Sequence, residues 1–173
     1  MRADARRNHD RLLAAAREVF DELGADAPLD DVARRAGIGN ATMYRHFPTR
    51  RDLLLAVYAD EVAALAAEGE ALLEARSPAD ALFGWLRSFI RHVATKRELA
   101  LTRDGPRSRL FDEWHESMHA TASALLTRAQ RAGAVRADLT VSDLLAMANG
   151  IALASADADQ TRRLLRFLRQ GTS

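Results

Sequence analysis

Hydrophobic residues recur at three- and four-residue spacing along almost the whole chain. Leu12, Ala16 and Val19 share one face of a helix predicted over residues 9–23, and Gly24 follows as its end. No stretch shows the polar and apolar alternation expected of a half-buried strand. The pattern therefore predicts an all-α fold of about nine helices.

Prolines and capping residues indicate where the other helices begin. Pro28 stands where a first helical position would be, and the helical pattern continues from there to Gly37. A very short helix is predicted over 41–47, ended by Pro48. The later helices are expected to begin near residues 49, 78, 98, 107, 140 and 157, the one over 98–104 being short.

Charge and composition narrow the class of protein. The net charge is only +1, yet the stretch from Val32 to Arg51 holds five arginines and no carboxylate. The chain has no Cys, which excludes disulfides, thiolate catalysis and Cys-ligated metals. No apolar run approaches the roughly 20 residues needed to cross a bilayer. We therefore expect a cytoplasmic protein with a basic surface and no membrane partner.

The turn at 37–40 joins two short helices in the manner of a helix-turn-helix. Ala33 is small where the two helices would cross, and Gly37 can adopt the positive φ that ends the first helix. Met43 and Phe47 lie four residues apart and are expected to face inward with Ile38.

The outward face of the second helix then carries short or hydrogen-bonding side chains. Asn and Arg can each make two bonds to one base edge, and Ala can contact a thymine methyl group. Tyr44, His46, Arg50 and Arg51 are better placed for phosphates. The residues predicted to bind double-stranded DNA are Asn40, Ala41, Thr42, Tyr44, Arg45, His46 and Arg50.

This region resembles the DNA-binding core of the tetracycline-repressor (TetR-like) family. The resemblance is strong from His9 to Leu54, above all in the run LDDVARRAGIGNATMYRHFPTRRDL, and RAQRAGAVRADL at 128–139 resembles a segment of the family's C-terminal half. The family usually has Ser or Thr at the position of Pro28, where it contacts phosphate, and Lys at the position of Arg50.

The resemblance implies a ligand-responsive repressor that binds a palindromic operator as a homodimer and is released by a small-molecule effector. DNA binding would lie in residues 1–50, and effector binding and dimerisation in residues 51–173. No cofactor is expected. Candidates for the effector pocket are Trp85, Phe89, His92, Phe111, Trp114, Met118 and Met147. Candidates for the dimer interface are Leu144, Leu145, Ala148, Ile151, Leu164 and Leu168.

One motif is typical of a different class of protein, although two ordinary histidines are the expected interpretation here. His115, Glu116 and His119 fit the H-E-x-x-H pattern of zinc metalloproteases, and two imidazoles at i and i+4 share one helix face. The usual third ligand is missing, because no His or Glu follows His119. A metal-dependent hydrolase, a metal bound by the two histidines in effector sensing, and a helical adaptor without DNA binding are the alternatives. We expect no enzyme and no metal site.

Overall fold

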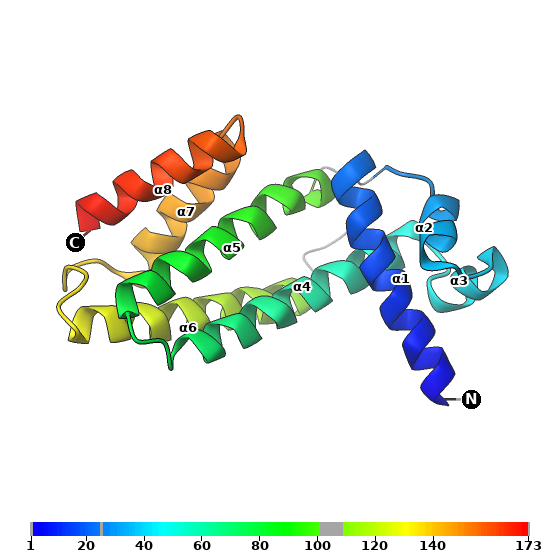
Figure 1. Cartoon of the computed structure of the whole chain (residues 1–173), viewed down its shortest axis with the longest axis horizontal. Helices are drawn as coiled ribbons and strands as arrows, with labels where there is room; N and C mark the ends of the chain where they lie inside the picture. Colours follow the sequence, from blue (N-terminus) through cyan, green and yellow to red (C-terminus); the bar gives the residue numbers. More distant parts are fainter. Residues whose placement is uncertain (1, 25, 101–108, 173) are drawn as a thin grey trace. The chain divides into compact units, whose positions relative to one another are not determined.

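The computed structural model describes residues 2–24, 26–100 and 109–172, and for 2–3, 95–100 and 109–111 the backbone alone. These residues form eight α-helices, which confirms the all-α prediction for the described chain. Figure 1 labels each of them. Residues 98–100 belong to the fifth helix, and the rest of the short helix expected over 98–104 lies outside the described residues. The helices are α1 Arg2–Leu23, α2 Leu29–Ala36, α3 Asn40–His46, α4 Arg50–Leu72, α5 Pro78–Ala100, α6 Arg109–Arg131, α7 Val141–Ala154 and α8 Ala158–Thr172.

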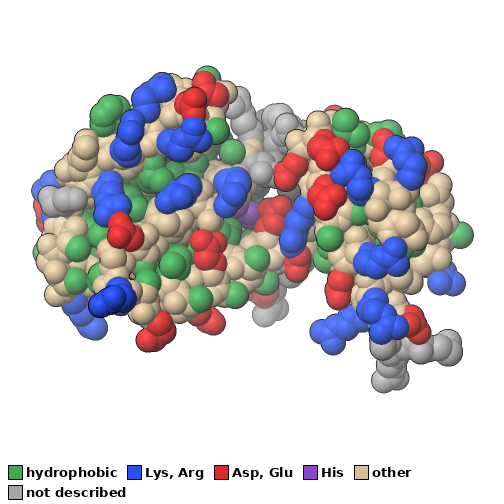
Figure 2. Space-filling model, in the orientation of Figure 1, with side chains coloured by type: hydrophobic (Ala, Val, Ile, Leu, Met, Phe, Trp, Pro, Cys, Tyr) green, Lys and Arg blue, Asp and Glu red, His purple; other side chains and the backbone are tan. Residues whose placement is uncertain are grey.

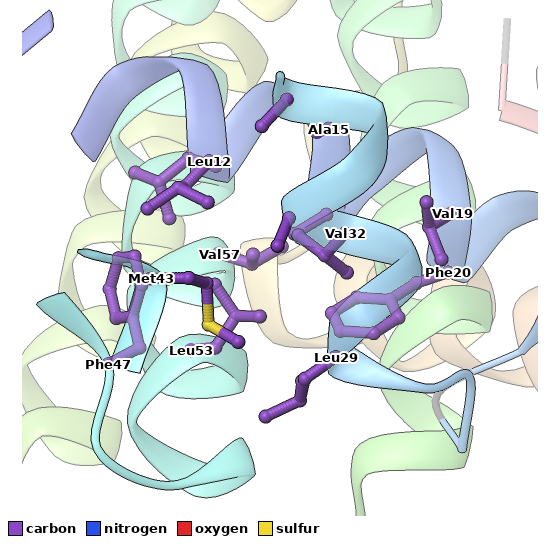
Figure 3. Close-up of a cluster of buried hydrophobic side chains, with 14 of the residues drawn as sticks. Leu12, Ala15, Val19, Phe20, Leu29, Val32, Met43, Phe47, Leu53 and Val57 are labelled. Atoms are coloured by element: carbon purple, nitrogen blue, oxygen red, sulfur yellow. The ribbon is translucent and has the colours of Figure 1, made fainter. Parts of the chain in front are cut away.

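The chain divides into two compact units, and the boundary between Asp60 and Glu61 falls within α4. The first unit contains α1, α2, α3, the beginning of α4 and, among the described residues, 98–100 at the end of α5. Its core is drawn in Figure 3, where Leu12, Val32, Met43 and Leu53 come together from α1, α2, α3 and α4. All four side chains are fully buried. Their burial provides the main stabilisation of so small a unit, since removing apolar surface from water is the dominant favourable contribution to folding.

Local capping explains where α4 and α7 begin. The Thr49 hydroxyl accepts a hydrogen bond from the Asp52 N–H at 3.2 Å, and the Asp52 carboxylate accepts from the Thr49 N–H at 3.0 Å. Thr140 and Asp143 form the same reciprocal arrangement before α7. Each pair satisfies N–H groups at the start of a helix that have no partner within the helix. The predicted helix starts near residues 49 and 140 are thus confirmed.

The start of α2 differs from the prediction by one residue. Pro28 is the cap rather than the first helical residue, and its ψ of 134° is extended. Its carbonyl oxygen accepts from the Asp31 N–H at 3.0 Å, but no side-chain bond caps the helix. Proline has no polar side-chain atom, so the first N–H groups of α2 lack the hydroxyl that Ser or Thr would supply.

In the second unit, the end of α4 packs closely against α5 and α6. The Trp85 indole of α5 donates a hydrogen bond to the Leu65 carbonyl of α4 at 2.9 Å. A Cβ atom built on Gly69 would lie only 2.1 Å from the Thr121 Cγ2 on α6 and 3.2 Å from the Trp85 Nε1. Gly69 is therefore required by this close approach, whereas glycine in an open helix position only weakens the helix.

Helix α7 contacts both α6 and α8 and completes the second unit. Its Leu144, Ala148 and Ala152 lie four residues apart and are buried. The end of α8 is joined to the loop after α6 by a hydrogen bond from the Arg136 N–H to the Thr172 carbonyl, 2.9 Å long. None of the described helices combines the length and the apolar sequence needed to cross a bilayer.

Candidate nucleic-acid interface

The turn between α2 and α3 has a fixed geometry. Gly37 adopts a left-handed φ of 64°, and the N–H of Ile38 donates to the Ala33 carbonyl at 2.9 Å. From α1, the Arg11 guanidinium donates to the Ala36 carbonyl at 2.5 Å. A Cβ on Gly37 would lie 3.0 Å from that guanidinium. Hydrogen bonds from within the turn and from α1 thus fix its backbone. The prediction that Gly37 supplies a positive φ is confirmed.

Helix α3 is anchored by its apolar side and presents its polar side outward. Met43 is fully buried and Phe47 is 3% exposed, with Ile38 partly buried against the same core. This confirms the predicted inward face. The structure places Asn40, Ala41, Tyr44 and Arg45 at exposed positions and leaves Thr42, His46 and Arg50 half-buried. All seven residues predicted to bind DNA are therefore on or beside one helix, and their contacts with DNA remain a prediction.

His46 lies close to two other aromatic rings. Its ring lies 6.2 Å from the ring of His9 on α1 and 6.3 Å from that of Phe47. His9 in turn lies 5.2 Å from Phe47. His46 therefore helps to join α1 to α3, so its substitution would disturb packing as well as the surface.

In the folded protein, carboxylates neutralise part of the positive charge of the stretch from Val32 to Arg51. Arg34 forms an ion pair with Asp31 at 2.8 Å, and Arg35 bonds to Glu18 and Glu22 of α1 at 3.1 and 2.7 Å. The bonds from Arg35 hold the pKa of the Glu22 carboxyl below its ordinary value, and those carboxylates raise the pKa of Arg35. At least two of the five arginines, Arg34 and Arg35, are thus paired with acids, and the sequence alone did not reveal this.

Arg45 differs from these paired residues. It is exposed on α3 and forms no ion pair with any described residue. It lies one residue from the exposed ring of Tyr44. A guanidinium that is not occupied by a carboxylate can give its planar fork to a base or a phosphate. Arg45 is therefore the cation of α3 best suited to bind nucleic acid.

Three of the seven residues predicted to line an effector pocket lie together on α5. The rings of Trp85 and Phe89 stack with centroids 5.4 Å apart, and both side chains are buried. His92 is buried beside them on α5, and its Nδ1 lies 2.8 Å from a Glu61 carboxylate oxygen. Met118 is also buried, Trp114 is half-buried, Met147 is 37% exposed, and the Phe111 side chain lies outside the described residues. Two surface hollows of the second unit are lined by other residues.

The dimer candidates separate into two groups. Leu144 and Ala148 are fully buried within the chain's own core, so they offer no surface to a second copy. Leu145, Ile151, Leu164 and Leu168 are half-buried. Leu153 and Phe167, which the sequence analysis did not single out, are 53% and 61% exposed on α7 and α8. On the amphipathic helix α8, a large apolar residue among polar ones could have been noticed in the sequence at Phe167.

The three residues of the H-E-x-x-H motif lie on α6. His115, Glu116 and His119 are all exposed. Within the described part of the chain, no three His, Asp or Glu side chains are grouped so that they could hold a metal ion. An exposed histidine pair on one helix face lacks the shielded cleft that a hydrolytic zinc site uses.

Two family models match the chain over separate segments. Residues 12–57 match the bacterial regulatory proteins of the tetR family. Residues 77–172, more than half of the chain, match the C-terminal domain of SbtR-like transcriptional regulators. A helix-turn-helix type transcriptional regulator of Staphylococcus aureus is 41% identical over 54 residues, which are 31% of this chain and 29% of that relative. The match to such curated relatives thus spans less than a third of their length.

Solved structures resemble the whole described fold. A TetR transcriptional regulator of Streptomyces coelicolor is 37% identical, with a TM-score of 0.81 over 95% of this chain and 97% of that one. A TetR regulatory protein of Mycobacterium vanbaalenii is 36% identical, with a TM-score of 0.79 over 99% of this chain and 98% of that one. The similarity therefore includes both compact units and is not limited to α1 to α3.

Proposed function

Because this chain belongs to the TetR family of bacterial transcriptional regulators, we propose that it is a repressor that binds a palindromic DNA operator as a homodimer and leaves it when a small effector binds. The family consists of regulators and not of enzymes. The proposed partners are duplex DNA, a second copy of the chain and an effector, and the proposed location is the cytoplasm.

One observation carries the DNA-binding part of this proposal. Helix α3 buries Met43 completely while it exposes Asn40, Ala41, Tyr44 and Arg45. A short helix that is fixed by its apolar side and exposes hydrogen-bonding side chains can enter the major groove by its N-terminal end. Asn40 and Arg45 would read base edges, Ala41 would contact a thymine methyl group, and Tyr44 would contact a phosphate.

The homodimer is supported by the exposed apolar residues of the last two helices. Met147, Leu153 and Phe167 leave large hydrophobic side chains in water, and partly buried leucines lie on the same helices. A dimer has a functional reason as well, because one short helix reads few base pairs. Two recognition helices spaced about 34–36 Å apart read two half-sites of a palindrome.

Effector binding is proposed for the cluster around Trp85, Phe89 and His92. Stacked aromatic rings next to an imidazole–carboxylate pair would suit an apolar or aromatic ligand with one polar group. Such a ligand can release DNA only if its affinity differs between the DNA-bound and the free form of the dimer. A ligand that binds tightly and leaves operator affinity unchanged would contradict this part.

Selection from random DNA tests the proposal as a whole. The purified protein is incubated with a pool of random duplexes at about 150 mM salt, where non-specific binding is weak. We expect the recovered sequences to share a palindrome with half-sites about one helical turn apart. A pool that stays random after repeated rounds would contradict the proposal. A recovered motif with a single half-site would contradict the homodimer alone.

A further inference from the structure

Arginine side chains line a hollow between α5 and α8, and the proposed function assigns them no role. The volume of the hollow is about 450 Å³. Figure 2 shows blue side chains gathered over α8 and the adjoining part of α5, with few red ones between them. The lining consists of five arginines, one carboxylate and two apolar residues, namely Arg87, Arg162, Arg163, Arg166, Arg169, Asp159, Phe83 and Leu165.

Two of the five arginines are held in place by neighbouring residues. The Arg169 guanidinium lies 5.5 Å from the centre of the Phe83 ring and pairs with Asp80 at 2.6 Å. Arg162 pairs with Asp159 on its own helix. Two of the lining charges are thus balanced within the protein, and the guanidinium of Arg169 is fixed at the wall of the hollow.

The other three lining arginines lack such balance. Arg87, Arg163 and Arg166 form no ion pair with any residue that the structure describes. No Asp or Glu occurs in the sequence after Asp159, whereas the whole chain has a net charge of only +1. Like charges that share a hollow repel one another, and a bound anion would remove that repulsion.

We propose that this hollow binds a small polyanion that carries phosphate groups. Guanidinium groups donate in a planar fork that matches two phosphate oxygens, and charge-assisted bonds of this kind are among the strongest in proteins. Arg87 of α5 and Arg166 of α8 lie on the two helices that border the hollow, so each would bind the ligand from its own side. The inference does not depend on the proposed DNA binding, since α3 does not line the hollow.

Calorimetry with inorganic tripolyphosphate tests this inference on the full chain. At about 150 mM salt we expect saturable binding to the wild type. The variant R87Q/R163Q/R166Q removes three charges and breaks no ion pair of the described residues, so it should fold normally. Its affinity should fall at least about tenfold, the usual consequence of losing hydrogen bonds to charged groups. The matched control R76Q removes an exposed arginine that does not line the hollow and should bind as the wild type does.

A second measurement locates the bound anion without any variant. Amide resonances in α5 near Phe83 and in α8 near Leu165 should shift when tripolyphosphate is added, and those of α3 should not. Absence of binding, or binding that the triple variant retains, would overturn the proposal. The same conclusion follows if the triple variant loses affinity for duplex DNA while tripolyphosphate binds to neither protein, since the arginines would then serve nucleic acid.

Discussion

Arg35 on α2 forms a bidentate ion pair with Glu22 on α1. Its Nη1 donates to one carboxylate oxygen at 3.0 Å and its Nη2 to the other at 2.7 Å. Glu18, one turn earlier on α1, accepts a further bond from Nη1 at 3.1 Å. The pair joins the first two helices, and it leaves Arg35 with less positive charge to offer to DNA than the sequence indicates.

This pair predicts a pH-dependent difference between the wild type and R35A. The pKa of Glu22 is lowered in the folded protein, so its contribution to stability is present at neutral pH and lost as the pH falls. R35A should therefore melt at a lower temperature than the wild type at pH 7. The difference should shrink below about pH 4, where carboxylates become protonated. Thermal melts at both pH values check this, and a difference that grows in acid would contradict it.

Gly69 predicts a destabilisation that a second substitution should relieve. A Cβ at this position would overlap the Thr121 methyl group, so G69A should lower the free energy of unfolding by about 1–3 kcal/mol. G84A is the matched control, because a Cβ there meets nothing within 4 Å and alanine favours helix. T121S removes the overlapping methyl group and should restore much of the stability of G69A. Urea unfolding is measured for the wild type, G69A, G84A and the double variant G69A/T121S. Equal losses of unfolding free energy in G69A and G84A would contradict the close approach.

The exposed position of Phe167 on α8 leads to a prediction about dimer formation. The wild type should sediment at twice the chain mass of 19.0 kDa, and F167D should shift it toward the monomer, because a carboxylate would be buried without a partner. L23D is the control, since Leu23 is equally exposed but lies at the end of α1. Sedimentation at several concentrations separates the cases. An F167D protein that dimerises as the wild type does would exclude Phe167 from the interface.

Sequence reasoning was most accurate where neighbours along the chain determine the structure. The Thr49 and Asp52 cap, the left-handed Gly37 and the inward Met43 depend on residues within four positions of one another. Helical spacing and capping chemistry are sufficient for such features. The shift of Pro28 from the first helical residue to the cap shows that even then a boundary can move by one residue.

Features that depend on distant residues were not predictable. The carboxylates that pair with Arg35 lie 13 and 17 residues away on α1, outside the acid-free stretch. Leu144 and Phe167 are both apolar helix residues, yet one is fully buried and the other is 61% exposed. Which side of an apolar helix faces its own core depends on how α6, α7 and α8 pack together, and no local pattern specifies that arrangement.

Arg45 provides the most direct measurement of the central claim, that the exposed side of α3 reads duplex DNA. Fluorescence polarisation would compare the wild type, R45A and R34A on the selected operator and on copies with one base pair changed. R45A should lose about 1–3 kcal/mol of binding free energy and its preference at one position of each half-site. R34A, whose guanidinium is paired with Asp31, should change little. An R45A protein that binds every duplex as the wild type does would contradict the account.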